Sequence, residues 1–177
     1  SFGNILVDNR TVKIDAFPMG IDYEKYSNAI HTPAVKKEIA KKQKKVEDRK
    51  IIFSVDRLDY SKGIIERLNS YELFLEKYPE YRKKVLMILV AVPSRTKVDK
   101  YRQLKKDLDE RVGRINGKHS TFGWAPVLYL YDSLSFDALC ALYSLSDVCL
   151  ITPMRDGMNL IAKEYIAAKN DGKGVLI

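Results

Sequence analysis

The chain has few of the residues on which metal and nucleophile chemistry depend. Its 177 residues include only two cysteines and two histidines. Cys140 and Cys149 show no motif spacing, so we interpret them as buried thiols of a reducing compartment rather than a disulfide or a metal site. His31 and His119 neither pair with a carboxylate at ligand spacing nor follow a strand-like run. The sequence therefore gives no support for metal catalysis, or for a serine or cysteine nucleophile with a histidine base.

Long apolar runs are also missing. No segment approaches the roughly 18 apolar residues of a membrane span, and no basic, apolar and small-residue signal segment is present. We therefore expect a cytoplasmic protein with no membrane partner. The chain begins at Ser1 without a methionine and stops at Ile177 inside an apolar run. For that reason we expect it to be a piece of a longer protein, truncated at both ends.

The charge is strongly positive, at +8 with a pI near 9.3, and 46% of the residues are apolar. This composition predicts one domain over residues 1–177 with a proper core and an acidic partner: nucleic acid, a membrane surface or a phosphorylated small molecule. Six of the ten residues 36–45 are lysine. No aromatic-basic stacking motif accompanies them, so we interpret this segment as a solvated outer helix and expect no nucleic-acid partner.

Short strand-like runs alternate with helical patterns from end to end. The expected strands are residues 12–17, 50–55, 85–92, 127–131, 148–151 and 174–177. The expected helices are the lysine-rich one after Thr32-Pro33, one after Gly63, one through residues 101–112, and residues 135–145 and 161–169. The alternation predicts an α/β fold: one Rossmann-like parallel sheet of about half a dozen βα units with helices on both faces. The glycine-punctuated stretch 113–123 is predicted to be a loop.

The segment Thr152-Pro153-Met154-Arg155-Asp156-Gly157-Met158-Asn159-Leu160 lies between the last long strand-like run and a helical pattern. A strand, a tight turn at Gly157 and a helix start are typical of a diphosphate cradle, because the glycine admits backbone approach and the first helical N–H groups face the anion. Asp156 is a candidate for a sugar hydroxyl. Glu164, further along the helix, is a candidate for a ribose.

Cations follow two other strands at the same predicted sheet edge. Arg57 and Lys62 come after the run 50–55, and Arg95 comes after the run 85–92. A guanidinium that holds two phosphate oxygens beside a lysine point charge suits a diphosphate leaving group. The competing interpretation for Arg57 is an ordinary loop salt bridge with Asp56 or Asp59.

Two further stretches invite a functional interpretation that we do not adopt. Residues 113–118 are basic and glycine-rich but lack the glycine-lysine-hydroxyl pattern of a nucleoside triphosphatase. The Asp107-Leu108-Asp109 pattern is similar to a metal-binding Asp-x-Asp, but it lies in the middle of a helical pattern with Leu108 predicted to face inward. A solvated helix face explains both aspartates.

The motifs after these strands resemble those of the trehalose-6-phosphate synthase family, which are retaining glycosyltransferases with two Rossmann-like domains (the GT-B fold). The matching segments cover most of the chain: residues 17–22, 54–63, 113–117, 146–148, 155–160 and 163–165. The pair Arg-Leu-Asp-Tyr-x-Lys-Gly and Arg-Asp-Gly-Met-Asn-Leu is highly specific. The resemblance implies glucosyl transfer from UDP-glucose to glucose 6-phosphate, giving α,α-trehalose 6-phosphate and UDP with retention, without a metal or other cofactor.

The resemblance also implies roles for individual residues. Arg57 and Lys62 match residues that bind the donor diphosphate, where neutralising the leaving group lets an oxocarbenium-like state form. Glu164 matches a ribose-binding position, Arg95 an arginine on the acceptor phosphate, and Leu134 lies near the uracil pocket. The remaining positions match residues that bind the donor glucose: Asp156, Gly157, Met158, Asn159 and Leu160.

Most of the acceptor pocket belongs to the amino-terminal domain of this family, which the chain lacks. We therefore expect the chain to supply the donor site, to bind UDP-glucose at most weakly and to be inactive alone. Three alternatives stay open: a related glycosyltransferase with another acceptor, a non-catalytic regulatory subunit of a trehalose synthase complex, and a nucleic-acid-binding module. A homo-oligomer of the full-length protein, a fused phosphatase domain and the use of ADP-glucose are likewise undecided.

Overall fold

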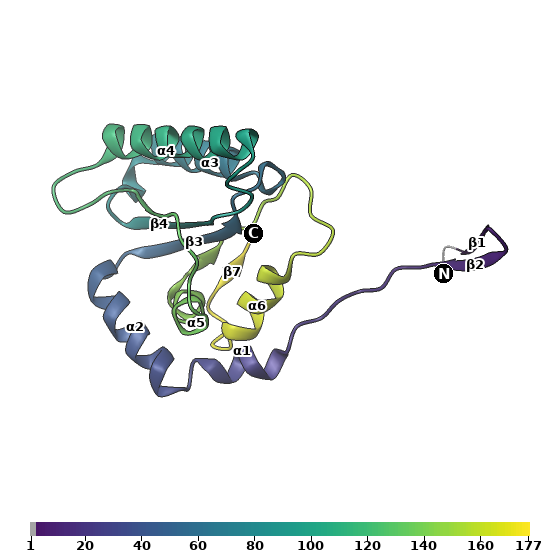
Figure 1. Ribbon diagram of the computed structural model, residues 1–177. Coiled ribbons are helices and arrows are strands. Elements are labelled where there is room, and N and C mark those ends of the chain that lie inside the picture. The colour runs from purple at the N-terminus through teal and green to yellow at the C-terminus, as the bar shows by residue number, and fades with distance from the viewer. Residues whose placement is uncertain (1–2) are drawn as a thin grey trace.

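The computed structural model describes residues 3–177, and its centre is a five-stranded parallel sheet. The strand order is β5-β4-β3-β6-β7 (Figure 1). The two central strands pair along their full length, from Lys50 opposite Val85 to Arg57 opposite Val92. Both are almost wholly buried, as their nearly continuous apolar sequences predict. The strands are β3 (Lys50–Arg57), β4 (Val85–Val92), β5 (Val127–Leu130), β6 (Val148–Cys149) and β7 (Val175–Leu176).

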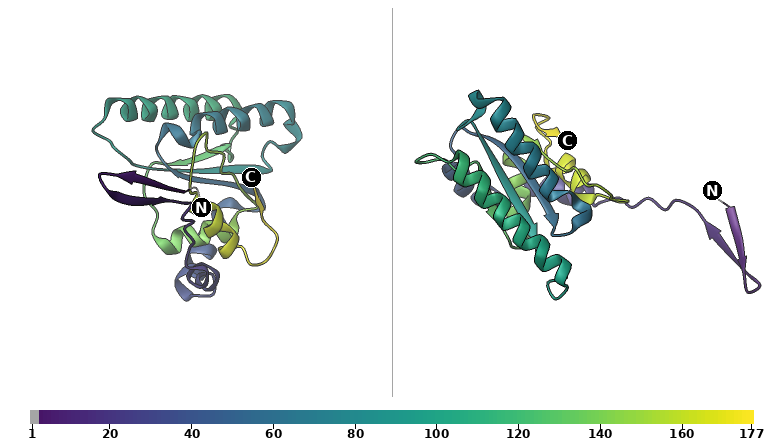
Figure 2. Two further views of the ribbon diagram at one scale, coloured as in Figure 1. Left: turned by 90° about the vertical axis from the view of Figure 1, so that its right-hand side faces the viewer. Right: turned by 90° about the horizontal axis from the view of Figure 1, so that it is seen from above.

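Helices cover both faces of this sheet (Figures 1 and 2). On one face lie α3 (Ile64–Lys77) and α4 (Asp99–His119). On the other lie α1 (Tyr23–Ala29), α2 (Pro33–Val46), α5 (Phe136–Leu145) and α6 (Leu160–Ala168). Two short 3-10 turns complete the elements, η1 (Tyr60–Lys62) and η2 (Pro79–Tyr81). The predicted α/β fold with helices on both faces is thus confirmed.

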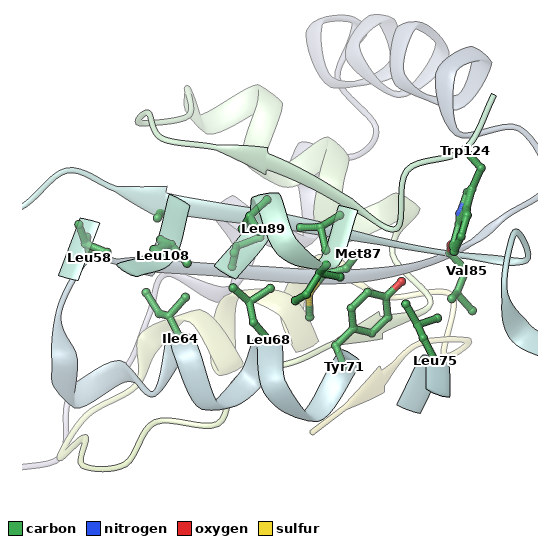
Figure 3. Packing of buried hydrophobic residues seen from close by; sticks show 14 residues of the cluster. Leu58, Ile64, Leu68, Tyr71, Leu75, Val85, Met87, Leu89, Leu108 and Trp124 are labelled. Carbon is green, nitrogen blue, oxygen red and sulfur yellow. The ribbon is translucent and has the colours of Figure 1, made fainter. Parts of the chain in front are cut away.

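The core under α3 comes from one apolar face of that helix. Ile64, Leu68, Tyr71 and Leu75 of α3 are buried against β4, as Figure 3 shows. At one end of this cluster the indole Nε1 of Trp124 donates a 2.8 Å hydrogen bond to the carbonyl oxygen of Val85. The polar atom of the single tryptophan is therefore satisfied inside an apolar environment.

The lysine-rich segment is a solvated helix, as predicted. Thr32 caps α2 by accepting a hydrogen bond from the N–H of Val35, and Pro33 occupies the first turn. Val35 and Val46 are buried, while the lysines are exposed or half-buried. Both cysteines are buried free thiols, again as predicted. Within residues 3–177 we find no helix with the length and apolar character that a membrane crossing requires.

The expected strand at residues 12–17 is wrong in its extent and in its partner. Residues 10–14 form β2 (Arg10–Ile14), which pairs antiparallel with β1 (Gly3–Val7) rather than joining the parallel sheet. Asp8 and Asn9 have φ angles of 47° and 60°, the left-handed conformation of a two-residue hairpin turn. The hairpin stands away from the domain at the end of an extended linker (Figure 2).

The loop predicted at residues 113–123 is also wrong over most of its length, because α4 continues to His119. Val112, Ile115 and His119 extend the buried face of the helix beyond Leu108, while Gly113 and Gly117 lie on its exposed side. Each glycine costs a helix interior about 1 kcal/mol, which the packing of that face offsets. The inward orientation predicted for Leu108 between two solvated aspartates is confirmed.

The strand order reverses between β3 and β6. From β3 the chain continues to β4 and β5 on one side of the sheet and then returns to β6 and β7 on the other. Strand β6 is only two residues long, shorter than the predicted run 148–151. Because the loops after β3 and β6 lead to helices on opposite faces, a crevice opens between them at the carboxyl edge of the sheet, the usual ligand position in this fold.

Candidate functional site

A cavity of about 240 Å³ lies in this crevice. It gathers six of the predicted site residues, Arg57, Lys62 and Asp156 with Met158, Asn159 and Leu160, and adds Val55, Asp56, Val92 and Ile161. Four predicted residues do not line it: Arg95, Leu134, Gly157 and Glu164. A larger cavity of about 500 Å³ lies near the amino ends of β3 and β4, with mostly apolar side chains such as Tyr71 and Phe74. Only the smaller cavity combines cations with the carboxyl edge.

The loop after β3 is fixed against the loop after β6. Gly63 has a φ of 61°, and a side chain on it would begin 2.8 Å from the carbonyl oxygen of Thr152. The carbonyl oxygen of Ser61 accepts hydrogen bonds from the N–H groups of Met154 and Arg155 at 2.9 and 3.1 Å. A glycine is therefore required at this close approach, and the two loops form one wall of the cavity.

An ion pair joins the two loops at the cavity. Nζ of Lys62 lies 2.5 Å from Oδ2 of Asp156, and each side chain is 13% exposed. Asp156 also accepts from the side-chain amide of Asn159 at 3.0 Å and from the N–H of Met158 at 3.3 Å. The hydrogen bond from Lys62, with further help from these donors, holds the pKa of Asp156 below its ordinary value. Asp156 is thus an oriented, ionised carboxylate.

Arg57 ends β3, and its side chain is exposed toward the cavity. The competing interpretation, a salt bridge with Asp56, is wrong because Asp56 pairs with Arg67 instead, with Nη1 of Arg67 2.9 Å from Oδ2. Asp59 is engaged by Ser61 and Tyr101. Within residues 3–177, Arg57 takes part in no ion pair closer than 4.0 Å, so its guanidinium is available to an anion.

Arg67 is the central structural residue of this edge, and the sequence reasoning missed it. Its side chain is fully buried and its guanidinium donates to Asp56, to the hydroxyls of Ser54 and Thr152, and to the carbonyl oxygen of Lys62. Burial raises the pKa of Asp56, and the charge of Arg67 opposes that shift. A signal was present: Arg67 falls on the same helical face as Ile64, where a cation needs a buried partner.

The backbone at Gly157 does not require a glycine, contrary to the tight glycine turn that we predicted there. Gly157 has no left-handed φ, and a side chain added to it would meet nothing within 4 Å. The helix α6 starts at Leu160, where the side chain of Asn159 accepts from the N–H of Ala162 at 3.1 Å. One of the N–H groups expected to face an anion is therefore capped, while open space surrounds Gly157.

Arg95 lies outside the cavity on the exposed loop after β4. Its backbone φ is 47°, and its Nη1 donates to the hydroxyl of Tyr101 at 2.6 Å. Tyr101 in turn donates to Oδ2 of Asp59 at 2.9 Å, and Asp59 caps the turn η1 that carries Lys62. Burial opposes ionisation of Asp59, but the hydrogen bonds from Ser61 and Tyr101 and the charge of Arg95 lower its pKa overall. A chain of contacts thus connects Arg95 to the loop of Lys62.

The last two predicted residues, Leu134 and Glu164, do not line the cavity, although they lie on the α5 and α6 side of the sheet next to it. Leu134 is half-buried next to the cap of α5 and packs against the core cluster of β3, β4 and α6. Glu164 is in the middle of α6, where its Oε2 accepts a 2.8 Å hydrogen bond from the hydroxyl of Tyr143. The structure therefore does not bring Leu134 and Glu164 into contact with the lysine-aspartate pair.

His119 is closer to carboxylates than its sequence position indicates. One of its ring nitrogens and carboxylate oxygens of Glu72 and Glu76 lie within 4.8 Å of one another. Arg114 and Lys118 already form ion pairs with these glutamates. Burial, followed by the charges of Arg82 and Lys118, lowers the pKa of His119. We interpret the group as a structural ion-pair network between α3 and α4, since three cations surround it.

The doubly wound sheet and the cationic cavity at its switch point define the class of this chain, a Rossmann-like glycosyltransferase domain. The chain belongs to glycosyltransferase family 20, whose sequence profile matches residues 2–177.

Its relatives are consistent with this family. A bifunctional trehalose-6-phosphate synthase/phosphatase of Thermoproteus tenax is 46% identical over 175 residues, which is 99% of the chain and 24% of that relative. A UDP-forming synthase of Burkholderia xenovorans in complex with glucose-6-phosphate gives a TM-score of 0.92 at 36% identity, covering 98% of the chain and 38% of that structure. An E. coli structure described as bound with UDP-2-fluoro glucose gives 0.90 at 38% identity, covering 99% and 39%. The chain thus spans 24% to 39% of the length of these relatives.

Proposed function

We propose that this chain supplies the donor side of a glucosyl transfer from UDP-glucose to glucose 6-phosphate, giving α,α-trehalose 6-phosphate and UDP. The observation that carries the proposal is the cavity at the switch point, where Arg57 and Lys62 face the oriented carboxylate of Asp156. Family 20 membership supports the reaction class, and the ligands named for the two related structures support the two substrates.

The chemistry follows from the charges in the cavity. Arg57 offers a guanidinium without a carboxylate partner, which suits a bidentate contact with the diphosphate, and Lys62 adds a point charge from the loop that follows Arg57. As the bond from glucose to UDP breaks, negative charge grows on the diphosphate and these two cations stabilise it. The carboxylate of Asp156 accepts a hydrogen bond from a hydroxyl of the donor glucose. Departure of the diphosphate on the face where the acceptor enters gives retention, and no metal is required.

The remaining predicted residues have supporting roles in this proposal. Glu164 binds the donor ribose, backbone groups near Leu134 approach the uracil, and the open space at Gly157 with Met158, Asn159 and Leu160 receives the glucose. Arg95 contacts the phosphate of the acceptor from the neighbouring loop. Most of the acceptor pocket belongs to a second domain outside these residues, and the chain alone does not turn over.

The first test is a titration of the chain with UDP and UDP-glucose, followed by amide shifts or calorimetry. We expect weak binding, with shifts confined to residues 57–63 and 152–164 and to the backbone near Leu134. Arg57→Ala removes a charge-assisted contact of about 1.5–3 kcal/mol, so the dissociation constant rises by about tenfold or more. Arg102→Ala is the matched control, since Arg102 is an exposed arginine on α4 outside the cavity. Equal losses in both variants, or shifts spread over the lysines of α2, contradict the donor site.

The second test measures turnover. The 177-residue chain is expected to form no trehalose 6-phosphate, whereas a protein that joins it to the acceptor domain is expected to be active. In that longer protein Arg57→Ala lowers kcat/KM by about two orders of magnitude, because it removes stabilisation of the leaving group. Activity within about a factor of two of the unmodified protein contradicts this role of Arg57.

A further inference from the structure

Three helices converge on the carboxylate of Glu164. The residue lies on α6, about one turn beyond the cavity-lining Leu160 and Ile161, and α1 and α5 both pack against that helix. From α5, the hydroxyl of Tyr143 donates to Oε2 of Glu164 at 2.8 Å. Tyr143 is completely buried, and its ring packs edge-on against Phe53 of β3 at 5.7 Å between centroids. The phenol that donates to Glu164 is therefore fixed in position by its packing in the core.

Tyr26 lies on α1, which packs against α6. Burial first, and then the interaction with Glu164, raise the pKa of Tyr26 to about 12. Burial and the charge of Glu164 raise the pKa of Tyr143 as well. Both hydroxyls thus stay protonated at neutral pH and are available as donors to the carboxylate, and that of Tyr143 makes the direct hydrogen bond. The ring of Tyr26 is fixed edge-on against Phe136 of α5, at 5.3 Å between centroids.

We propose that Tyr143 and Tyr26 are positioning residues, which fix the Glu164 carboxylate so that it can accept both hydroxyls of a nucleotide ribose. The proposal rests on the donor role of Glu164 given above. A vicinal diol is recognised by a carboxylate only when the plane of that carboxylate is set, and a free glutamate has three rotatable side-chain bonds that otherwise must be ordered on binding. The donor from the buried Tyr143, with the half-buried phenol of Tyr26 beside it, restricts that freedom before the ligand arrives.

Tyr165 provides a matched comparison in the same cluster. It is a buried tyrosine of α6, one residue after Glu164, and its ring packs edge-on against that of Tyr143 at 6.1 Å between centroids. Its hydroxyl has no hydrogen-bond partner within residues 3–177. Loss of the Tyr165 hydroxyl therefore tests packing alone, whereas loss of the Tyr143 or Tyr26 hydroxyl tests the positioning of the Glu164 carboxylate.

The experiment compares the dissociation constants of UDP and 2′-deoxy-UDP in the unmodified chain and in Tyr143→Phe, Tyr26→Phe, Tyr165→Phe and Glu164→Ala. The ratio of the two constants reports recognition of the ribose and cancels any general effect on folding. We expect the unmodified chain to prefer UDP by about tenfold, as for one hydrogen bond to a charged group. Glu164→Ala reduces the ratio to near one, Tyr143→Phe and Tyr26→Phe reduce it about threefold, and Tyr165→Phe leaves it unchanged.

Each other outcome overturns a defined part of the scheme. If Glu164→Ala keeps the full preference for UDP, Glu164 is not the ribose residue and both proposals about it fail. If Glu164→Ala loses the preference but the Tyr143 and Tyr26 variants keep it, the ribose role stands and the positioning role is overturned. A uniform loss of affinity for both nucleotides with an unchanged ratio also overturns positioning. Absence of UDP binding by the unmodified chain overturns the proposed function and this inference with it.

Discussion

The ammonium nitrogen of Lys62 lies 2.5 Å from Oδ2 of Asp156, although 94 residues separate the two in sequence. One residue ends the turn after β3 and the other follows β6, so the contact bridges the switch point of the sheet. The cation proposed for the diphosphate is therefore already paired before a ligand is bound. A diphosphate must therefore compete with Asp156 for Lys62, unless Lys62 contacts Asp156 and the diphosphate at the same time.

This competition predicts that Asp156→Asn tightens the binding of UDP. The substitution removes a negative charge beside the proposed diphosphate position and releases Lys62. Where water screens these charges, the gain is about 1 kcal/mol, or roughly fivefold in affinity. Transfer of glucose falls by about tenfold or more, because the acceptor of a donor-sugar hydroxyl is lost. Calorimetry with UDP and an assay of the longer, two-domain protein measure the two effects.

The control for this prediction is Asp171→Asn, another aspartate paired with a lysine, which is half exposed and outside the cavity. It should leave UDP affinity unchanged. A weaker affinity for UDP in Asp156→Asn would mean that Asp156 supports Lys62 rather than competing with the diphosphate.

The sequence was sufficient to predict which residues line the cavity, but not which contacts stabilise it. Residues that directly follow parallel strands share one edge, and this rule alone brings Arg57, Lys62 and Asp156 together. The contacts of Arg67 and Tyr101 depend on which helix faces which loop, a tertiary relationship that no local pattern encodes. The continuation of α4 beyond Val112 was missed for a different reason: helix propensity argued against Gly113 and Gly117, and packing of the opposite face overrode it.

Arg67→Met is predicted to destabilise the fold strongly. Arg67 and Asp56 form a buried pair with 0% and 3% exposed side chains, and removal of one partner leaves an uncompensated buried charge, at a cost of about 3–5 kcal/mol. Chemical denaturation measures the free energy of unfolding. Arg102→Met is the matched control: its pair with Asp99 is exposed, so we expect a change of no more than about 0.5 kcal/mol.

The same variant has a defined pH dependence. Burial raises the pKa of Asp56, and Arg67 normally opposes that shift, so Arg67→Met raises the folded-state pKa further. When the folded-state pKa of a carboxyl lies above its unfolded-state value of about 3.9, the folded state binds the proton more tightly. The free energy of unfolding therefore falls as the pH rises from the unfolded-state pKa to the folded-state pKa. The deficit of Arg67→Met is thus expected to be small near pH 4 and to grow toward neutrality. Asp56→Asn in the same chain should remove this pH dependence, and a deficit that is constant with pH argues against an ionised Asp56.

Tyr101→Phe is predicted to change the KM for one substrate of the proposed reaction and not for the other. The substitution keeps the buried ring but removes the hydroxyl that joins Arg95 to Asp59. Arg95 then loses its fixed position, and in the two-domain protein the KM for glucose 6-phosphate rises by about fivefold to tenfold while the KM for UDP-glucose changes little. Tyr71→Phe, which removes a buried hydroxyl bonded to the carbonyl oxygen of Pro126, is the control. Equal increases for both substrates would show that Tyr101 supports the fold rather than Arg95.

The two glycines Gly63 and Gly117 are predicted to respond to alanine in opposite directions. At Gly63 the φ of 61° costs about 1 kcal/mol for any other residue, and the added carbon would lie 2.8 Å from the backbone oxygen of Thr152, so the two loops must separate. Gly117 lies inside α4 with nothing within 4 Å of the new carbon, so alanine there stabilises the fold by about 0.5–1 kcal/mol. Denaturation midpoints measure both effects, and UDP titration shows whether the separated loops of Gly63→Ala also lose the cavity. A neutral or destabilising effect of Gly117→Ala would place the end of α4 before residue 117 in solution, which restores the loop that the sequence pattern indicated.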